Sequence, residues 1–289
     1  MTLTDFFNNY YWPLKITQLR ECTLVGYESS WRLYVQPKFG DWEMADIKAR
    51  DIEQWLLSFD KPGAAKKSYS LLRPILRTAI RYDFLEVDPT QKVEYRVPKK
   101  KYIPPTLSKK ELNQLLEGFR GVDIEAWLLV AASTGVRKEE GAALNWEDID
   151  LRTGAVKIDK GAQWVNGKEV VNPPKTQLSY RTIYLPEKIL KRLREIAGVN
   201  PKGRLTGKFN ASQIGAAYKR RCQKLNLPYI PPKCLRHTWA TIALAEGVPL
   251  SVVSRNLGHY DVSTTARYYT APKDEELIKA SEIYNNVFK

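Results

Sequence analysis

The chain has 289 residues, of which 43% are apolar and 11% aromatic, enough for the packed cores of two domains and too many for a disordered protein. Its 46 lysines and arginines outnumber 32 acidic residues, and the net charge of +14 suits a polyanionic partner such as nucleic acid. Three cysteines without a CxxC pair argue against a disulfide framework and a thiolate metal site, and no apolar run approaches the roughly 20 residues of a membrane span. We therefore expect a cytoplasmic protein.

Residues 1–95 are predicted to form a small helical bundle. Apolar side chains recur at intervals of three and four residues over residues 24–34, 52–59 and 72–80. Several of these side chains are aromatic. At this spacing aromatic residues belong to a helical core more often than to a surface that stacks on nucleobases.

Residues 96–107 are predicted to be a basic, proline-rich linker. The slightly longer stretch 96–110 holds six basic residues, three prolines and no acidic residue. Proline fixes φ and has no N–H to donate, so such a stretch favours an extended chain. The segment is either a surface loop with solvated charge or an extended linker that follows a phosphate backbone. In the second case Lys99, Lys100 and Lys101 bind DNA.

Residues 108–270 are predicted to form a second domain that begins with helices. Ser108 and Glu111 have the spacing of a capping box, which indicates that a helix begins there. Residues 124–130 continue a helical and apolar pattern, and helices resume at Glu187.

Between these helices the hydrophobic period changes to that of strands. Residues 155–159, 169–172 and 180–185 are predicted to be three short strands, with Asn166-Gly167 as the hairpin turn between the first two. The fold class expected for the chain is therefore mainly α with a small antiparallel β-sheet, a helical bundle followed by an α+β domain.

Two further segments are expected to lie on the surface. From Lys188 to Lys224 there are eleven basic residues and one acidic residue, Glu195, which predicts a cationic face containing Arg220 and Arg221 as DNA-binding residues. Residues 271–289 are predicted to be a C-terminal tail helix. This helix either packs on its own domain or docks on a neighbouring copy.

Four segments carry residues suited to phosphate chemistry. They are Thr134-Gly-Val-Arg137-Lys-Glu-Glu140, Pro174-Lys175-Thr176, Lys233-Cys-Leu-Arg236-His237, and Leu257-Gly-His259 followed nine residues later by Tyr268. Together they resemble the tyrosine recombinases, the phage integrase family, from about residue 130 to about residue 270. The resemblance implies a helical core-binding domain followed by a catalytic domain.

By this resemblance Arg137 and Arg236 hold the scissile phosphate, and Glu140 supports the site. Outside this context Arg137 and Glu140 would be an ordinary ion pair on a helix surface. Arginine suits the task because its planar guanidinium donates two parallel hydrogen bonds to the two non-bridging phosphate oxygens.

Lys175 resembles the family's hairpin lysine, which donates a proton to the leaving 5′ oxygen; lysine, with a pKa of about 10.4, is an adequate acid for an alkoxide. Lys233 departs from the family, which most often has histidine at this position, so its role is expected to be electrostatic. His237 is expected to be a core or capping residue, because the residue after Arg236 points about 100° away on a helix.

His259 is implied to hydrogen-bond the phosphate and Tyr268 to be the nucleophile. Gly258 is expected to cap a helix and to let His259 turn into the site. Tyr269 is a competitor, but the spacing of nine residues after His259 selects Tyr268. A phenol with a pKa of about 10 is protonated at neutral pH, so the cationic cluster must favour the phenolate as it forms. A phosphotyrosyl bond conserves the energy of the broken diester, so no metal or other cofactor is expected.

The sequence therefore predicts a site-specific DNA recombinase or integrase, of a phage or another mobile element, that acts through a 3′-phosphotyrosyl intermediate. Its partners would be double-stranded DNA with inverted-repeat core sites and three further copies of the chain in a tetramer, with any accessory directionality factor left open. Because only about 17 residues precede the first predicted helix of the bundle, we expect no additional module that binds arm-type sites. A type IB topoisomerase and a catalytically silent DNA-binding regulator remain as alternatives.

Overall fold

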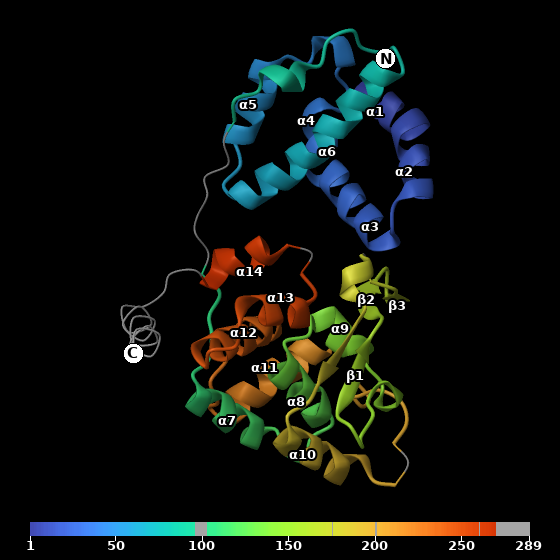
Figure 1. Ribbon diagram of the computed structural model, residues 1–289. Helices are drawn as coiled ribbons and strands as arrows, with labels where there is room; N and C mark the ends of the chain where they lie inside the picture. Colours follow the sequence, from blue (N-terminus) through green and yellow to red (C-terminus); the bar gives the residue numbers. More distant parts are fainter. Residues whose placement is uncertain (96–102, 175, 200, 260, 270–289) are drawn as a thin grey trace, which may run out of the picture. The chain divides into compact units, whose positions relative to one another are not determined.

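The computed structural model describes residues 1–95, 103–174, 176–199, 201–259 and 261–269. The chain divides after Lys101 into two compact units (Figure 1). Two expected features, the DNA-binding lysines 99–101 and the tail helix 271–289, lie outside the described residues.

The first unit is entirely helical over its described residues, as its sequence pattern predicts. A π-helical turn joins α1 to α2, and another joins α3 to α4, so the chain from Glu21 to Phe39 is helical throughout. The α-helices are α1 (Leu3–Phe6), α2 (Trp12–Gln18), α3 (Glu21–Ser30), α4 (Gln36–Phe39), α5 (Ala49–Leu57) and α6 (Pro62–Arg81).

Helix α6 supplies one side of the first unit's core. It begins at Pro62, whose fixed φ and missing N–H are tolerated in the first turn of a helix. Most of its apolar side chains are buried, and Leu72, Ile75 and Leu76 are fully buried. It contacts α3 and α5, and Figure 1 shows it as the long helix between them.

The second unit combines eight α-helices with four short strands over its described residues. The capping box predicted at Ser108 and Glu111 is confirmed: the Ser108 N–H donates to the Glu111 carboxylate at 2.8 Å, and α7 begins there. The helices are α7 (Lys109–Gly118), α8 (Glu125–Thr134), α9 (Lys138–Ala143), α10 (Glu187–Ala197), α11 (Ile214–Lys224), α12 (Leu235–Ala245), α13 (Leu250–Leu257) and α14 (Val262–Tyr269).

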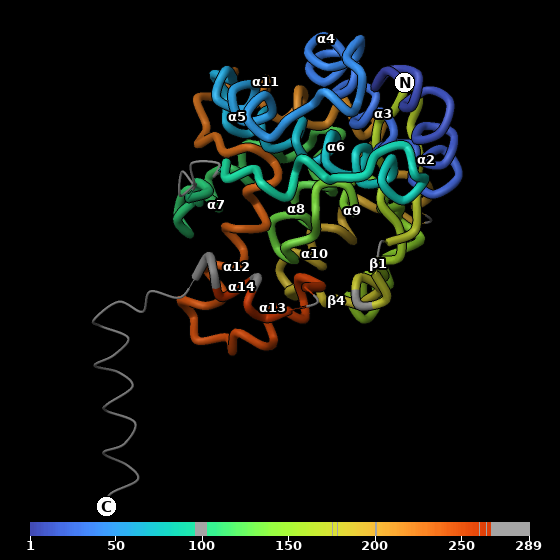
Figure 2. The backbone as a smooth tube through the Cα atoms, turned by 90° about the horizontal axis from the view of Figure 1, so that it is seen from above, coloured from blue at the N-terminus to red at the C-terminus, as the bar shows by residue number. Residues whose placement is uncertain are grey.

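Helix α8 is the centre of the second unit. Its residues 126–132 are all buried, and a helix that is apolar on every side must be covered by neighbours. It contacts α7, α9, α10 and α12. Both views place the strands on one side of α8, with α12 and α13 on the other (Figure 1 and Figure 2).

The strands differ from the prediction of one sheet with three strands. Strand β1 (Ala155–Ile158) pairs with β4 (Arg181–Tyr184), and β2 (Gly161–Val165) pairs with β3 (Lys168–Asn172), both antiparallel. The Asn166-Gly167 turn is a hairpin turn, but it joins β2 to β3. Strand β2 escaped prediction because its first residue, Gly161, has the composition of a turn.

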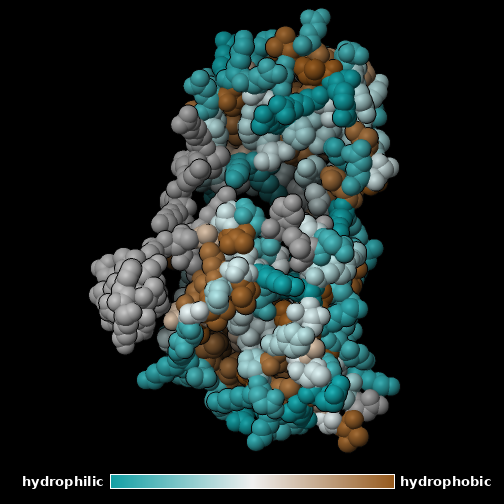
Figure 3. Space-filling view, in the orientation of Figure 1, coloured by the Kyte–Doolittle hydropathy of each residue, from teal (hydrophilic) through white to brown (hydrophobic). Residues whose placement is uncertain are grey.

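Hydrophilic residues cover much of the face that Figure 3 shows of each unit. Within the described parts of the chain, no helix has both the length and the apolar character required to cross a membrane.

Candidate functional site

The end of α8 places the first arginine. Gly135 ends this helix in the left-handed conformation, with φ of 68°, and a Cβ at this position would lie 2.7 Å from the ring of Trp239. Glycine is therefore required both by the backbone and by the space. Two residues later Arg137 is the N-cap of α9 and donates its backbone N–H to Glu140 at 2.8 Å.

Glu140 lies between two arginines from distant segments. Its Oε1 accepts from Nη1 of Arg137 at 2.6 Å, and its two oxygens accept from Nη1 and Nη2 of Arg181 at 3.2 and 2.8 Å. The side chains of Glu140 and Arg181 are 8% and 7% exposed, whereas that of Arg137 is 36% exposed. Of the two guanidiniums, Arg137 is thus the one available to a ligand.

The charge of Glu140 is secured by this pairing. Burial alone would raise its pKa, but the hydrogen bond and positive charge of Arg181, and then of Arg137, lower the pKa to about 2 from its usual 4.5. A permanently ionised carboxylate holds Arg137 in one orientation. That Glu140 supports a catalytic site stays a prediction.

Replacement of Glu140 by glutamine is expected to destabilise the second unit by about 3–5 kcal/mol at pH 7, because Arg181 would keep a buried charge without a carboxylate. The folded pKa lies below the unfolded one, so the contribution of Glu140 is complete above about pH 4.5 and is lost as pH falls towards 2. We therefore expect the free energies of unfolding of Glu140→Gln and of the unmodified chain, measured in urea, to differ less at pH 3 than at pH 7.

Glu117→Gln is the matched control for this measurement. Glu117 pairs with Arg120 on the surface, where both side chains are more than half exposed, so its loss is expected to cost less than about 1 kcal/mol. Equal stability of Glu140→Gln and the unmodified chain at pH 7 would refute the supporting role.

The second arginine comes from α12, which packs against α8. Nη1 of Arg236 donates to the Gly135 carbonyl at 2.9 Å, and Nη2 donates to the Leu257 carbonyl at 2.7 Å. Arg236 thus joins the end of α8 to the end of α13. Both of these acceptors are backbone carbonyls at helix ends, so they fix the position of the guanidinium.

Three consecutive carbonyls at the end of α13 accept from three arginines. Asn256 accepts from Nε of Arg181 at 2.6 Å, Leu257 from Arg236, and Gly258 from Nη2 of Arg137 at 3.1 Å. The end of a helix carries partial negative charge and unpaired carbonyls, which the guanidiniums complement. The turn at the end of α13 therefore brings Arg137 and Arg236 into one cluster.

Gly258 ends α13 in the left-handed conformation, with φ of 65°, which confirms the predicted helix cap. His259 follows it directly into the cluster. Its Nε2 lies 2.8 Å from Nη2 of Arg236, and its Nδ1 lies 2.7 Å from Oγ1 of Thr265. Burial, followed by the charges of Arg236, Arg137 and Arg181, lowers the pKa of His259 to about 4, so the ring is neutral at pH 7.

The other residues singled out in the sequence are Tyr268, Lys175, Lys233 and His237. Tyr268 lies in α14, which contacts α13, but only its backbone is described. Lys175 lies outside the described residues. Lys233 is exposed in the 3₁₀ turn Pro232–Cys234, which leads directly into α12. His237 is half-buried, and burial, Arg236 and Lys233 lower its pKa.

Arg181 is the residue of this cluster to which sequence reasoning assigned no role. The alternation of side chains along the strand could have indicated one, because residues two apart share a face and Ile183 of β4 is buried. Arg181 therefore faces inward with Ile183, and an inward-facing charge requires a partner. What the sequence could not show is that the partner is Glu140.

Several basic residues of the stretch from Lys188 to Lys224 pair with acidic residues. A count of charges within the stretch does not include acidic partners from other segments. Arg192 pairs with Glu125, Arg204 with Glu169, and Lys208 with Asp123. Of the two predicted DNA-binding residues, Arg220 is exposed, whereas Nε of Arg221 donates to the Gly118 carbonyl at 2.9 Å.

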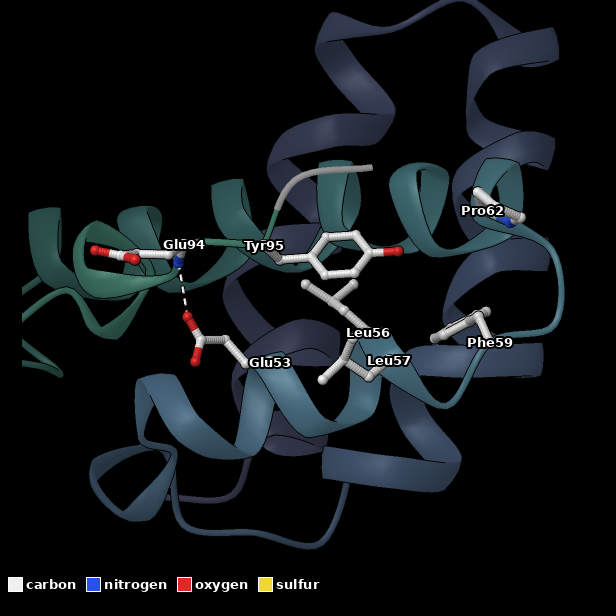
Figure 4. Close-up of a pocket in the computed structure, with 7 residues that line it drawn as sticks. All are labelled: Glu53, Leu56, Leu57, Phe59, Pro62, Glu94 and Tyr95. Carbon is white, nitrogen blue, oxygen red and sulfur yellow. Dashed lines mark hydrogen bonds between the residues drawn. The ribbon is translucent and has the colours of Figure 1, made fainter. Parts of the chain in front are cut away.

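One pocket lies away from this cluster, in the first unit. Its cavity has a volume of about 490 Å³, and its walls are mainly apolar (Figure 4). Glu53, one of its two acidic residues, already accepts from the Glu94 N–H at 2.6 Å. Nothing in this pocket resembles a phosphate-binding site. Among the described residues, moreover, no group of three His, Cys, Asp or Glu side chains could hold a metal ion.

Comparison with known proteins identifies both units. The profile described as "Phage integrase family" matches residues 105–276, and that described as "Phage integrase, N-terminal SAM-like domain" matches residues 2–58. The tyrosine recombinase XerC-like protein of Caldanaerobacter subterraneus is 24% identical, over 100% of this chain and 84% of its own length. Tyrosine recombinase XerA of Thermococcus kodakarensis is 28% identical, over 86% of each chain.

Solved structures share the fold of the described residues. The Tn1549 transposon integrase bound to transposon right end DNA has a TM-score of 0.81 at 16% identity, covering 99% of this chain and 100% of that chain. A lambda integrase dimer bound to a COC′ core site has a TM-score of 0.70 at 19% identity, covering 93% and 95%. At these identities the likeness establishes the fold.

Proposed function

Because the chain belongs to the phage integrase family, whose profile matches more than half of it, we propose that it is a site-specific DNA recombinase acting through a phosphotyrosyl intermediate. The observation that carries this proposal is the convergence of Arg137 and Arg236 on the turn that ends α13. Helix α14, with Tyr268, follows this turn after a few residues.

In the proposed reaction the Tyr268 phenol releases its proton to solvent as its oxygen attacks the scissile phosphorus. The bond from phosphorus to the 5′ oxygen breaks, Lys175 gives that oxygen a proton, and the 3′ end stays on the enzyme as a phosphotyrosine. Arg137 and Arg236 hold the non-bridging oxygens while charge redistributes on the pentacoordinate phosphorus. A donor placed in this way contributes roughly 10²–10³ in rate. Attack by the 5′ hydroxyl of another strand reverses the step and joins the new strands.

The proposed substrate is double-stranded DNA with inverted-repeat core sites, cut by a tetramer of the chain in the cytoplasm. Solved relatives support this: one lambda integrase structure is a tetramer bound to a Holliday junction, and Tn1549 integrase is bound to circular intermediate DNA. Basic residues of the linker, Lys99 to Lys101, would follow the backbone of that DNA, with Lys233 and the exposed Arg220 adding positive charge to the catalytic unit.

A nicked suicide duplex tests the proposal. The duplex carries the inverted repeats found at the ends of the encoding element, and the short fragment beyond the nick diffuses away after cleavage. We expect a covalent complex that survives detergent, together with a new 5′ hydroxyl that a polynucleotide kinase can label. No covalent complex would favour a silent DNA-binding regulator. Relaxation of a supercoiled plasmid that lacks the repeats would favour a type IB topoisomerase.

A further inference from the structure

Thr265 connects the helix of the nucleophile to the phosphate-binding cluster. It lies in α14, one helical turn before Tyr268, and its side chain is completely buried. Its Oγ1 lies 2.7 Å from Nδ1 of His259, whose Nε2 lies 2.8 Å from Nη2 of Arg236. A continuous line of hydrogen bonds therefore runs from Arg236 through His259 to α14.

The chemistry of the three groups fixes the direction of this line. A guanidinium only donates, so Nε2 of His259 must accept from Arg236 and carries no proton. In a neutral imidazole the proton then resides on Nδ1, and this N–H donates to Oγ1 of Thr265. Burial, followed by the charges of the surrounding arginines, lowers the pKa of His259, which favours the same neutral ring. In this arrangement His259 contacts Arg236 and has no N–H left for a phosphate oxygen, in contrast to the role that the resemblance implies for it.

Helix α14 depends on such contacts. It has eight residues, and an isolated helix of this length is not stable in water, so packing must hold it in place. At its start, Asp261 accepts from the Ser263 N–H at 2.8 Å, which orders the first turn. The contact of Thr265 with His259 joins the helix to the cluster, three residues before Tyr268.

We infer that Thr265 is a positioning residue: through the Nδ1–H tautomer of His259 it sets the placement of α14, and hence of Tyr268, relative to Arg236. The inference rests on the proposed function. It assigns Thr265 no contact with DNA. Loss of its hydroxyl should therefore slow strand cleavage without weakening DNA binding, because the phosphate contacts of Arg137 remain.

Two variants of the full-length chain separate this role from a structural one. Thr265→Val keeps the shape of the side chain but removes the acceptor, whereas Thr265→Ser keeps the acceptor. In single-turnover cleavage of the suicide duplex we expect Thr265→Val to be slower by about tenfold or more, and Thr265→Ser to stay within about threefold of the unmodified chain. The dissociation constant for the duplex should stay the same in all three.

Nitrogen-15 NMR of the imidazole rings gives a readout that a loss of packing would not produce. The chain has two histidines, so the signals of His259 are those that disappear in a His259→Gln variant. We expect a protonated Nδ1 and a bare Nε2 in the unmodified chain and in Thr265→Ser. In Thr265→Val we expect Nε2 to stay bare, because Arg236 still donates to it, and the Nδ1 signal to shift, because this N–H loses its acceptor.

Three results would overturn the inference: a protonated Nε2 in the unmodified chain, an unchanged cleavage rate in Thr265→Val, or equal losses of cleavage in the valine and serine variants. Failure of the unmodified chain to cleave would instead refute the proposed function, and the role of Thr265 with it. Because the tautomer is measured without DNA, these two failures are distinguishable.

Discussion

Arg236→Lys is expected to slow single-turnover strand cleavage by about 10²–10³-fold, and Arg236→Ala to abolish measurable cleavage. A lysine ammonium cannot reproduce the planar fork that donates to the Gly135 and Leu257 carbonyls and contacts His259. It would also present the phosphate with a point charge in place of two parallel donors. Rates are measured with the enzyme in excess over the suicide duplex, and DNA affinity is measured separately by gel shift.

Arg120→Lys is the control for this experiment. Arg120 is about half exposed and pairs with Glu117, so the exchange should leave the cleavage rate unchanged. Thermal unfolding of both variants shows whether the second unit is intact. A folded Arg236→Lys variant that cleaves at the normal rate would contradict the assignment of Arg236 to the phosphate.

Tyr268→Phe is expected to eliminate the covalent complex altogether, because phenylalanine has no oxygen to attack phosphorus. Binding of the duplex should persist, since it depends on the cationic groups of the chain. The matched control is Tyr269→Phe, which removes the same hydroxyl from the adjacent residue of α14. We expect Tyr269→Phe to form the complex at a rate within a few-fold of the unmodified chain. The opposite pattern would make Tyr269 the nucleophile.

The sequence predicts much of this architecture because local patterns determine it. Helical spacing identifies the first unit, the capping box locates the start of α7, and the glycine at 258 ends α13 as expected. The motif residues Arg137 and Arg236 are found from their neighbours in sequence. Strand β2 is missed because strand pairing is a non-local property, and its sequence begins with a residue that favours turns.

The contacts that organise the cluster are likewise non-local. Arg181 is 41 residues from Glu140 and 75 from the Asn256 carbonyl, and no spacing rule connects such distances. Thr265 lies within a recognised motif, yet its role emerges only when the His259 ring is seen between it and Arg236. The ion pairs of the basic stretch follow the same rule, because their acidic partners come from other segments.

Identification of the residue that carries the DNA is the most direct test of the central claim. The covalent complex is trapped on the suicide duplex, the DNA is trimmed by nuclease, and the protein is digested with trypsin. Cleavage after Arg267 and Lys273 gives one peptide that contains both Tyr268 and Tyr269. Fragmentation of this peptide in the mass spectrometer shows which of the two tyrosines carries the nucleotide. The predicted result is a 3′-linked nucleotide on Tyr268. A nucleotide on Tyr269, on another residue, or joined through its 5′ phosphate would contradict the account.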